Sequence, residues 1–273
     1  MPTPQPSCPL CGHPERRLAA RWADWEAALA HRDDGQMRLE AGRACGVAED
    51  APDLLQCTAC GSVGMSAIPD DRQLAAFYAN YHMTEGFVAK AAKKVARARK
   101  RLVLLGFLAP RRAGGKRRFL ELGASIGTAA EAARRAGFEP HAVEIDLGAI
   151  EKGRELFPDI HFIAGEIDAV PGAEPYQLLY GAEVIEHVPD PGDFLDHCRR
   201  LLAPGGVLFL TTPDCGHRKR PEPLLAWHSV KPPEHINLFT KAGMSALLSA
   251  HGFERHYLLP HAKPGMRVIA WRG

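Results

Sequence analysis

Hydrophobic positions in the second half of the chain follow two different periods. Short apolar runs alternate with longer segments in which apolar residues return every three or four positions. The runs predict strands at 117–123, 141–146, 161–164, 176–182 and 206–212. The longer segments predict helices at 127–136, 148–157 and 191–203. Strands and helices that alternate across short loops form parallel βαβ units with helices on both faces of one sheet, so the pattern predicts an α/β domain.

The first of these strands runs into a glycine-rich turn. The chain from Phe119 to Gly127 reads FLELGASIG, and an alanine-rich helix follows it. Because Gly123 and Gly127 lack a Cβ, the backbone can turn sharply there and come close to a ligand. The helix N-terminus beyond the turn presents unpaired N–H groups. This arrangement is typical of a crevice that binds a nucleotide-like ligand at the carboxyl end of a first strand.

The second strand ends in carboxylates, at the distance from the turn that a ribose-binding acid requires. Glu144, at the strand tip, is our candidate for the group that accepts hydrogen bonds from both ribose hydroxyls. The turn has neither the Gly-Lys-Ser/Thr of a phosphate-binding loop nor the Gly-x-Gly-x-x-Gly of a dinucleotide fold. Glu121 would repel a pyrophosphate, and it suits instead a cationic ligand with an amino group and a sulfonium.

At these residues the sequence resembles the class I S-adenosylmethionine (SAM) dependent methyltransferases. The run ELGASIG from Glu121 to Gly127 matches the first motif of that family, with Ser125 in place of the usual central glycine, and Glu144 matches its ribose-binding acid. The resemblance covers roughly residues 70–265. It implies SAM as the cofactor and a doubly wound, mostly parallel, seven-stranded Rossmann-like sheet. The last two segments, Phe253–Leu259 and Met266–Trp271, would form the antiparallel pair that closes such a sheet.

The same resemblance implies a set of cofactor contacts at the strand ends. Glu121 would face the methionine end of SAM, and the residues after the third strand would meet the adenine. The full set of predicted cofactor-binding residues is Glu121, Gly123, Ser125, Gly127, Glu144, Ile145, Glu166, Ile167 and Glu183.

The fourth strand leads into an acid–histidine run, EVIEHVPDP, from Glu183 to Pro191. This run resembles a segment of the ubiquinone-biosynthesis O-methyltransferases and of many natural-product methyltransferases. Because histidine titrates near neutral pH and a carboxylate can orient it, Glu186 and His187 are candidates for general-base catalysis. The same group would suit a divalent ion, or would simply pin the loop and cap the next helix.

A second histidine precedes the last helix, in the run PPEHINLFT. In the resembled family a Glu-His pair at this place comes before the last helix, and its histidine faces the acceptor pocket. His235 is therefore a second candidate for the base. The alternative is a structural histidine, since loop residues of this kind serve either purpose.

Two copies of Cys-x-x-Cys-Gly mark the N-terminal region. Cys8 and Cys11 form the first pair, and Cys57 and Cys60 form the second. Two residues between the thiolates let a tight knuckle direct both sulfurs at one ion. Four thiolates complete a tetrahedral Zn²⁺ site with no open position, which marks a structural rather than a catalytic metal. The alternative, two unrelated surface pairs, does not account for the glycine that follows both copies.

Helical patterns fill the rest of the first half. Leu18–Leu29 predicts a short amphipathic helix whose tryptophans form a small core, or else a partner surface. A second helix begins near Pro69, and aromatic residues follow it. By the resemblance, Tyr78, Tyr81 and His82 would form a lid over the site, or else pack against the main domain.

The segment Lys90–Arg101 is densely basic. It is either a phosphate-binding patch for RNA or a nucleotide-sugar, or a solvated helix face whose Val95, Leu102 and Leu105 pack inward. We favour the solvated face, because no aromatic residues interleave with the basic ones.

Composition places bounds on these interpretations. The chain has 273 residues, 46% hydrophobic and 24% charged, with a formal net charge of +2, so charge alone gives no argument for nucleic acid. No apolar run approaches the ~18–20 residues of a membrane span, and the N-terminus has no signal pattern, so we expect a cytoplasmic location and no membrane partner. Seven cysteines, two pairs of them as Cys-x-x-Cys, favour metal over disulfides.

We therefore predict a zinc-ribbon domain at 1–68, a helical linker or lid at 69–116 and a SAM-binding methyltransferase domain at 117–273. The predicted function is methyl transfer to a small-molecule acceptor, such as a natural product, a sugar or a related metabolite. One alternative is an rRNA or tRNA methyltransferase that holds RNA with the zinc ribbon and the basic helix. The other is a zinc-ribbon interaction protein without turnover. The sequence indicates no oligomeric state.

Overall fold

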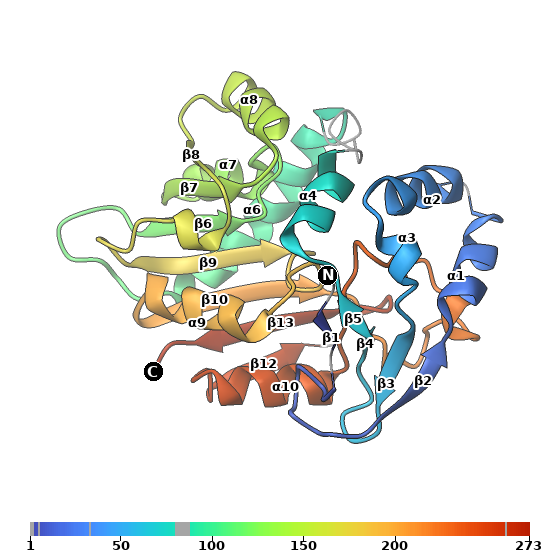
Figure 1. The fold of residues 1–273 in the computed structure, drawn as a ribbon. Coiled ribbons are helices and arrows are strands. Elements are labelled where there is room, and N and C mark those ends of the chain that lie inside the picture. Colours follow the sequence, from blue (N-terminus) through green and yellow to red (C-terminus); the bar gives the residue numbers. More distant parts are fainter. Residues whose placement is uncertain (1–2, 5, 33, 80–87, 260) are drawn as a thin grey trace.

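A seven-stranded sheet forms the larger half of the molecule (Figure 1). The computed structural model describes residues 3–4, 6–32, 34–79, 88–259 and 261–273. The strand order is β12-β13-β10-β9-β6-β7-β8, with β6 to β10 parallel and the last pair antiparallel. The strands are β6 (Arg118–Leu122), β7 (Glu139–Glu144), β8 (His161–Ala164), β9 (Tyr176–Ala182), β10 (Leu202–Thr212), β12 (His256–Leu259) and β13 (Met266–Trp271). This confirms the predicted doubly wound fold and its closing antiparallel pair.

Helices cover both faces of this sheet, and each face has its own core. Leu208 and Leu210 of β10 belong to one core, and Val207 and Phe209 to the other, because successive side chains of a strand point to opposite faces. The first core packs against α9 and α10, and the second packs against α6 and α7. The helices are α6 (Ala91–Leu108), α7 (Thr128–Arg135), α8 (Leu147–Leu156), α9 (Pro191–Leu201) and α10 (Lys241–Ala250). None of the described helices is both long enough and apolar enough to span a membrane.

Side-chain caps begin three of these helices. Asp146 accepts the N–H groups of Gly148 and Ala149 at the start of α8, and Asp190 and Thr240 cap α9 and α10 in the same way. The predicted helix at 191–203 ends earlier, at Leu201, and β10 begins at Leu202 rather than at 206. The reason is that Leu202 already pairs with Tyr176 before the chain turns and pairing resumes at Val207.

The N-terminal lobe is built on a second, four-stranded sheet with the order β11-β4-β3-β2. Trp22 begins a helix later than predicted, because the preceding residues pair in β2. Trp22, Trp25 and Leu29 are buried, which confirms the small core. The elements are β1 (Thr3–Pro4), β2 (Arg16–Ala20), α1 (Trp22–Leu29), α2 (Gly35–Ala44), α3 (Val47–Asp50), β3 (Leu54–Cys57), β4 (Val63–Met65), β5 (Ala67–Ile68), α4 (Asp71–Ala79) and β11 (Asn237–Leu238).

This second sheet contains a strand from the C-terminal half of the chain. Asn237 and Leu238 of β11 pair antiparallel with Gly64 and Val63 of β4. Cys215, Trp227, Val230 and Ile236 lie in the same core as the tryptophans of α1. The boundaries at 68 and 116 stay predictions, but the buried hydrophobic residues of the segment 215–238 pack in the core of the N-terminal lobe.

The N-terminal lobe lies at the carboxyl edge of the parallel strands. In Figure 1 the arrowheads of β9 and β10 point toward it. The connection that follows β10 leads from the large sheet to the N-terminal lobe, and it includes the short helix η2 (Leu224–Ala226). Arg32, at the end of α1, donates hydrogen bonds to the carbonyls of Leu225, Trp227 and Val230 in this connection. The lobe therefore covers the edge where α/β sheets bind ligands.

Gly127, the N-cap of α7, tests how tightly the turn after β6 is packed. Its φ is +77°, and a Cβ there would lie 2.7 Å from Cζ of the buried Phe162. We expect Gly127→Ala to lower the free energy of unfolding by roughly 2–4 kcal/mol, the sum of the left-handed backbone cost and overpacking. Urea denaturation followed by circular dichroism measures the loss.

Gly114→Ala is the matched control. Its φ is +74°, and nothing lies within 4 Å of the added Cβ. It should lose only about 1 kcal/mol, from the backbone alone. Equal losses in the two variants would show that the turn is not closely packed against Phe162.

Candidate functional site

The turn after β6 has an unusual backbone. Gly123, Ser125 and Gly127 all have positive φ, of 57°, 48° and 77°. A Cβ on Gly123 would lie 2.7 Å from Cγ2 of Val184, so only glycine fits there without a shift. Ser125 occupies the left-handed region although it has a Cβ, which is uncommon for residues other than glycine. The serine that departs from the predicted motif therefore adopts a glycine-like conformation.

Glu121 ties this turn to the helix that follows. Its carboxylate accepts the N–H groups of Ala129, at 3.2 Å, and Ala130, at 2.6 Å, in the first turn of α7. Burial raises the pKa of Glu121 to about 8, and the charge of Glu144 adds to the effect. Both oxygens thus anchor α7, and the predicted contact of Glu121 with the methionine end of a cofactor stays a prediction.

Glu144 joins the turn to the end of β7. One oxygen accepts the N–H of Ser125 at 2.6 Å, and the other accepts those of Ile145 and Asp146 at 2.8 and 2.9 Å. Each oxygen of a carboxylate has two acceptor sites, so the oxygen bound to Ser125 keeps one site for a ligand hydroxyl. The carboxylate therefore lies between the two loops where a ribose would be held.

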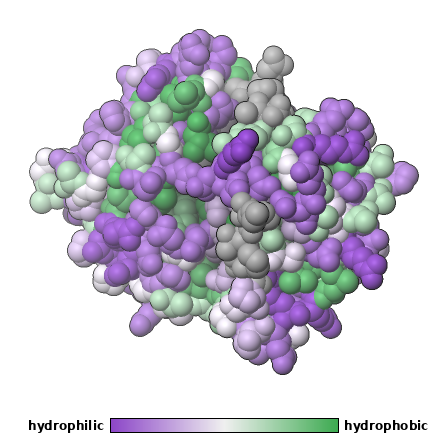
Figure 2. Space-filling model, in the orientation of Figure 1, coloured by the Kyte–Doolittle hydropathy of each residue, from purple (hydrophilic) through white to green (hydrophobic). Residues whose placement is uncertain are grey.

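The third predicted segment meets Glu144 from the other side. The N–H of Gly165 donates to the carbonyl of Glu144 at 2.9 Å, and this places Glu166 and Ile167, after β8, beside it. Ile145 and Leu147 are large hydrophobic residues that are 46% and 69% exposed. Figure 2 shows hydrophobic residues gathered on the α/β half, to the left of the view. Exposed apolar surface next to a polar strand edge is what a flat heterocyclic base requires.

A second cluster lies at the ends of β9 and β10. Glu186 is 0% exposed, and one of its oxygens accepts the hydroxyl of Thr212 at 2.9 Å, while no described residue donates to the other. Burial raises the pKa of Glu186 well above its ordinary value, and the charge of Glu183 adds to this. Glu183 itself has a φ of 58° and accepts the hydroxyl of Thr211 at 3.0 Å. Glu186 is thus a buried carboxyl with one oxygen available.

The two predicted histidines lie together in this cluster. The rings of His187 and His235 are 4.7 Å apart, with 80° between their planes. Burial lowers the pKa of His187 to about 4 and that of His235 well below 6.5, so both are neutral at pH 7. Nδ1 of His235 donates to the carbonyl of Ser229 at 2.8 Å, which leaves Nε2 as an acceptor. A neutral imidazole with a free lone pair can take a proton.

The same residues satisfy the geometry of a metal site. Glu186, His187 and His235 offer ligand atoms that lie within 4.8 Å of one another. Two imidazoles and a carboxylate are a common ligand set for divalent transition metals. The structure therefore brings together all three predicted catalytic residues in an arrangement that suits either a base or an ion.

The N-terminal lobe supports this cluster through a residue that the sequence analysis missed. Arg38 of α2, 4% exposed, forms an ion pair with Glu234, the neighbour of His235. Asp34 binds the other side of the guanidinium at 2.7 Å. The Glu234 charge counteracts the lowering of the His187 pKa. No pattern identifies Arg38, because an arginine in a polar helix is ordinarily solvated.

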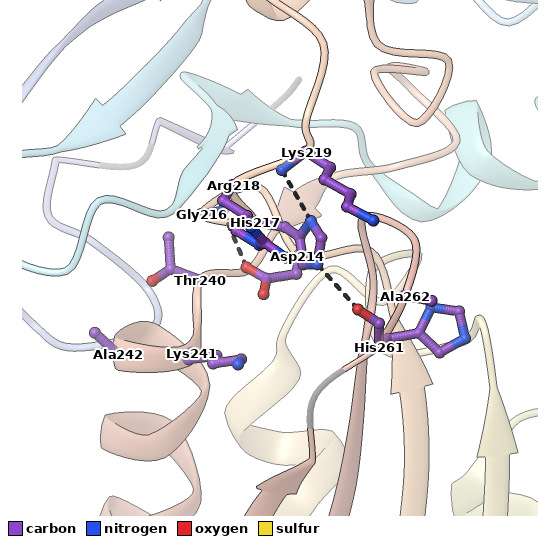
Figure 3. Close-up of a pocket in the computed structure, with 10 residues that line it drawn as sticks. All are labelled: Asp214, Gly216, His217, Arg218, Lys219, Thr240, Lys241, Ala242, His261 and Ala262. Carbon is purple, nitrogen blue, oxygen red and sulfur yellow. Dashed lines mark hydrogen bonds between the residues drawn. The ribbon is translucent and has the colours of Figure 1, made fainter.

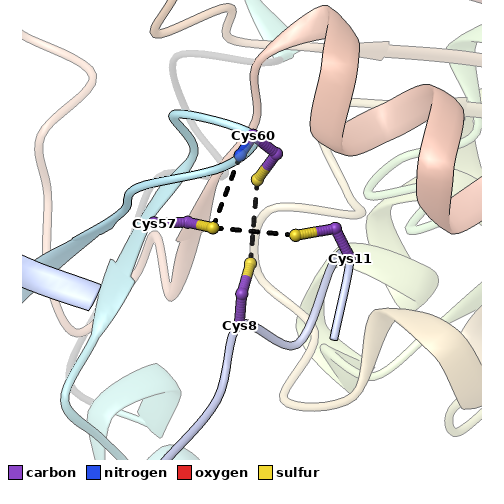
Figure 4. A group of neighbouring side chains, drawn as sticks. All are labelled: Cys8, Cys11, Cys57 and Cys60. Carbon is purple, nitrogen blue, oxygen red and sulfur yellow. Dashed lines mark hydrogen bonds between the residues drawn. The ribbon is translucent and has the colours of Figure 1, made fainter. Parts of the chain in front are cut away.

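The four cysteines converge on one point (Figure 4). The Sγ atoms of Cys8 and Cys60 are 3.7 Å apart, and those of Cys11 and Cys57 are 3.6 Å apart. All four lie within 4.8 Å of one another. Around an ion with zinc–sulfur distances of about 2.3 Å, the edges of a regular tetrahedron would be about 3.8 Å. The predicted ligands thus have the spacing that zinc requires.

Two other predictions concern the segment before β6. Tyr81 and His82 lie outside the described residues, as does the side chain of Tyr78, so the lid is not described. In α6, Val95, Leu102 and Leu105 are buried, while the basic residues Lys93, Arg97 and Lys100 are exposed. This is the predicted solvated face, and a role in RNA binding stays an untested prediction.

Comparison with known proteins identifies the half that carries this site. A family model described as a methyltransferase domain matches residues 87–258. The ubiquinone biosynthesis O-methyltransferase of Caulobacter sp. (strain K31) is 35% identical over 103 residues, which are 35% of this chain and 40% of that protein. That of Salmonella arizonae is 33% identical over 121 residues, 40% of this chain and 48% of that protein. The chain thus spans less than half the length of these curated relatives.

Solved structures share the fold at low identity. A candidate O-methyltransferase from Nostoc punctiforme PCC 73102 has a TM-score of 0.54 and 18% identity, over 65% of this chain and 56% of that one. The N-terminal domain of EvdMO1, solved in the presence of SAH and D-fucose, has a TM-score of 0.50 and 17% identity, over 64% and 83%. Both show the architecture alone.

The depressed pKa of His187 predicts a pH-dependent stability. The pKa is about 4 in the folded protein and 6.5 in the unfolded chain. Between these values the unfolded state binds a proton that the folded state does not, so stability falls as pH falls from 6.5 to 4. His187→Gln should remove about 1.4 kcal/mol of this loss per pH unit, as measured by urea denaturation across that range.

His31→Gln, at an exposed position outside the cluster, is the control and should parallel the wild type. The raised pKa of Glu186 acts in the opposite direction, because it costs stability as pH rises, but it is common to all three proteins. If His187→Gln also runs parallel to the wild type, the imidazole is not buried in its neutral form.

Proposed function

We propose, from the premise that this chain belongs to the class I SAM-dependent methyltransferases, that it transfers a methyl group from SAM to a small-molecule acceptor. The observation that carries the proposal is the position of Glu144 between the left-handed turn and the segment after β8. These three segments meet at one edge of the sheet, where the family binds its cofactor.

The residues present fit SAM. Glu144 would hold the ribose hydroxyls, and Ile145, Glu166 and Ile167 would border the adenine. The methionine end would lie along the turn formed by Gly123, Ser125 and Gly127, near Glu121 and Glu183. SAM supplies an electrophilic methyl group on a sulfonium.

The neighbouring cluster fits an acceptor that must lose a proton, such as a hydroxyl. His235 is our first choice for the base, because its Nδ1 proton is committed to Ser229 and its Nε2 is therefore the basic nitrogen. His187 packs against it, and the low pKa values keep both rings unprotonated at neutral pH. Much of the rate would come from holding donor and acceptor in line between these two groups of residues.

The N-terminal lobe would hold a structural zinc ion and cover the acceptor side. The four thiolates fill a tetrahedral site, which leaves no position for a substrate. Cys60 lies against the cap of α10, because the hydroxyl of Thr240 donates to its carbonyl at 2.6 Å. The ion would thus fix the turn that contains Cys57 and Cys60, and this turn contacts the N-terminus of α10.

Isothermal calorimetry with SAM tests the cofactor site. We expect micromolar binding by the wild type, in the range usual for enzyme ligands. Glu144→Gln should weaken binding roughly 10- to 100-fold, because it removes charge-assisted hydrogen bonds to the ligand. Circular dichroism should show that the variant remains folded.

Glu151→Gln on the exposed face of α8 is the matched control, and it should bind SAM as the wild type does. A folded wild-type protein that does not bind SAM would overturn the proposal. So would equal affinities of wild type and Glu144→Gln.

Metal analysis tests the zinc ribbon. We expect the purified protein to contain a single equivalent of zinc, and Cys57→Ser to lose it along with much of the stability of the N-terminal lobe, since structural zinc contributes folding energy. Cys45→Ser is the control, because Cys45 is buried but lies outside the four-cysteine cluster.

Metal-free wild-type protein, or equal zinc loss in Cys45→Ser, would contradict the zinc site. A second equivalent that disappears in His235→Gln would assign Glu186, His187 and His235 to an ion instead of to a base.

A further inference from the structure

A surface cavity of about 520 Å³ lies beyond the carboxyl end of β10. It opens between the chain after Asp214 and the first turn of α10, with the residues near His261 on its third side (Figure 3). Its lining residues are Asp214, Gly216, His217, Arg218, Lys219, Thr240, Lys241, Ala242, His261 and Ala262. Neither the cofactor segments nor the acid–histidine cluster contributes to this lining.

The charges around the cavity favour an anion. Arg218, Lys219 and Lys241 are exposed cations, and Asp214 is the one acid among the described residues of the lining. The first turn of α10 adds the positive end of a helix. Thr240 Oγ1 accepts the N–H of Gly243, and Lys241 and Ala242, in the first turn of α10, line the cavity. Such a combination of cations and a helix N-terminus suits phosphate.

Asp214 adds a hydrogen-bond acceptor to the wall of the cavity. It is 2% exposed, and its Oδ1 accepts the N–H of Gly216 at 3.0 Å. No described residue donates to Oδ2. Burial raises the pKa of this carboxyl, and the charges of Lys241 and His217 oppose the rise. Asp214 lines the cavity, so its second oxygen is open to a donor that enters the cavity, such as a ligand hydroxyl.

The cavity adjoins the acceptor side of the proposed active site. Thr212, which binds Glu186, and Asp214 are two residues apart at the end of β10. His261, on the far wall, contributes to the electrostatic environment of Glu183. His217 holds this wall in place, because its Nε2 lies 3.0 Å from the carbonyl of His261.

We propose that this cavity binds a phosphate group of the methyl acceptor, and that Asp214 accepts a hydrogen bond from a hydroxyl next to that phosphate. The acceptor is then a phosphorylated, hydroxyl-bearing small molecule. The volume exceeds what a phosphate alone fills and lies in the range of small-molecule sites. This inference rests on the proposed methyl transfer, since it names the class of its acceptor.

Amide NMR of the full chain locates binding without knowledge of the natural acceptor. Inorganic phosphate, glucose 1-phosphate and glucose are titrated while the signals of Gly216, Lys241 and Ala242 are followed. We expect both phosphates to shift these signals and glucose not to do so. Glucose 1-phosphate should bind several-fold more tightly than phosphate, because its hydroxyls can reach Asp214.

Two variants separate the parts of the site. The double variant Lys219→Ala/Lys241→Ala should bind inorganic phosphate and glucose 1-phosphate at least about tenfold more weakly than the wild type. The control variant Lys93→Ala/Lys100→Ala, which removes two exposed cations of α6, should bind both as the wild type does. Asp214→Asn can keep the hydrogen bond from Gly216, and it should abolish the preference for glucose 1-phosphate while phosphate still binds.

Absence of shifts at the three amides, or shifts that the Lys219/Lys241 variant leaves unchanged, would overturn the cavity as a phosphate site. An equal response of wild type and Asp214→Asn to both phosphates would overturn the role of Asp214. All titrations are made without SAM, so they are independent of the calorimetry. Phosphate binding without SAM binding would refute the proposed function and leave the cavity as an anion site that serves no methyl acceptor, and the reverse result would refute the cavity alone.

Discussion

The pairing of β11 with β4 is the constraint on which the rest of the site depends. Two residues of the C-terminal half add a strand to the N-terminal sheet, and the connection before them is thereby held against the carboxyl edge of the large sheet. The backbone N–H groups of Ile236 and Asn237 also donate to the carbonyl of Glu186, at 2.9 and 3.2 Å. His235 is thus placed from two sides, by the N-terminal sheet and by the loop that carries the other histidine.

This constraint connects the four-cysteine cluster to the acid–histidine cluster and to the cavity beside α10. Oγ of Ser62 accepts the N–H of Thr240 at 3.0 Å, and Thr240 in turn binds Cys60 and caps α10. On the other side of the lobe, Arg38 pairs with Glu234 next to His235. Breaking a buried pair of this kind leaves an uncompensated charge, which costs far more than losing a surface pair. The N-terminal lobe therefore helps to position His187 and His235, which it does not contain.

The parts of the fold that sequence predicted are those that local pattern determines. The spacing of hydrophobic residues predicted the strands and helices of the parallel sheet, and the two Cys-x-x-Cys pairs predicted the four-cysteine cluster. Both patterns can be recognised because each is contained in a short stretch of sequence. Glu144, Glu186 and His187 follow strands of the parallel sheet, and the sequence could place them together because strand ends that are distant in sequence meet at one edge of such a sheet; their roles stay predictions. The two-residue β11 has no periodicity to detect, and Arg38 has meaning only through a partner 196 residues away. The two contacts of Glu121 with α7 were also missed, since its carboxylate was assigned to a ligand and not to the helix amides.

Because the strands follow one another in a fixed order across the sheet, the chemical character of the residues at their carboxyl ends changes from one side of the sheet to the other. On one side of β6 lie β7 and β8, whose ends present Glu144, exposed apolar residues and Glu166. On the other side lie β9 and β10, whose ends present buried carboxyls and the imidazole of His187, and beyond them Arg218, Lys219 and Lys241 add cations. The chain reverses its winding between β6 and β9, which is the switch point where open sheets form their crevice. A cationic sulfonium bound at that point would have the nucleoside on the first side and an acceptor on the second. A phosphate on the acceptor would then lie at the far end of the edge, where its charge is matched and where it is separated from Glu183 and Glu186 by the length of the acceptor itself.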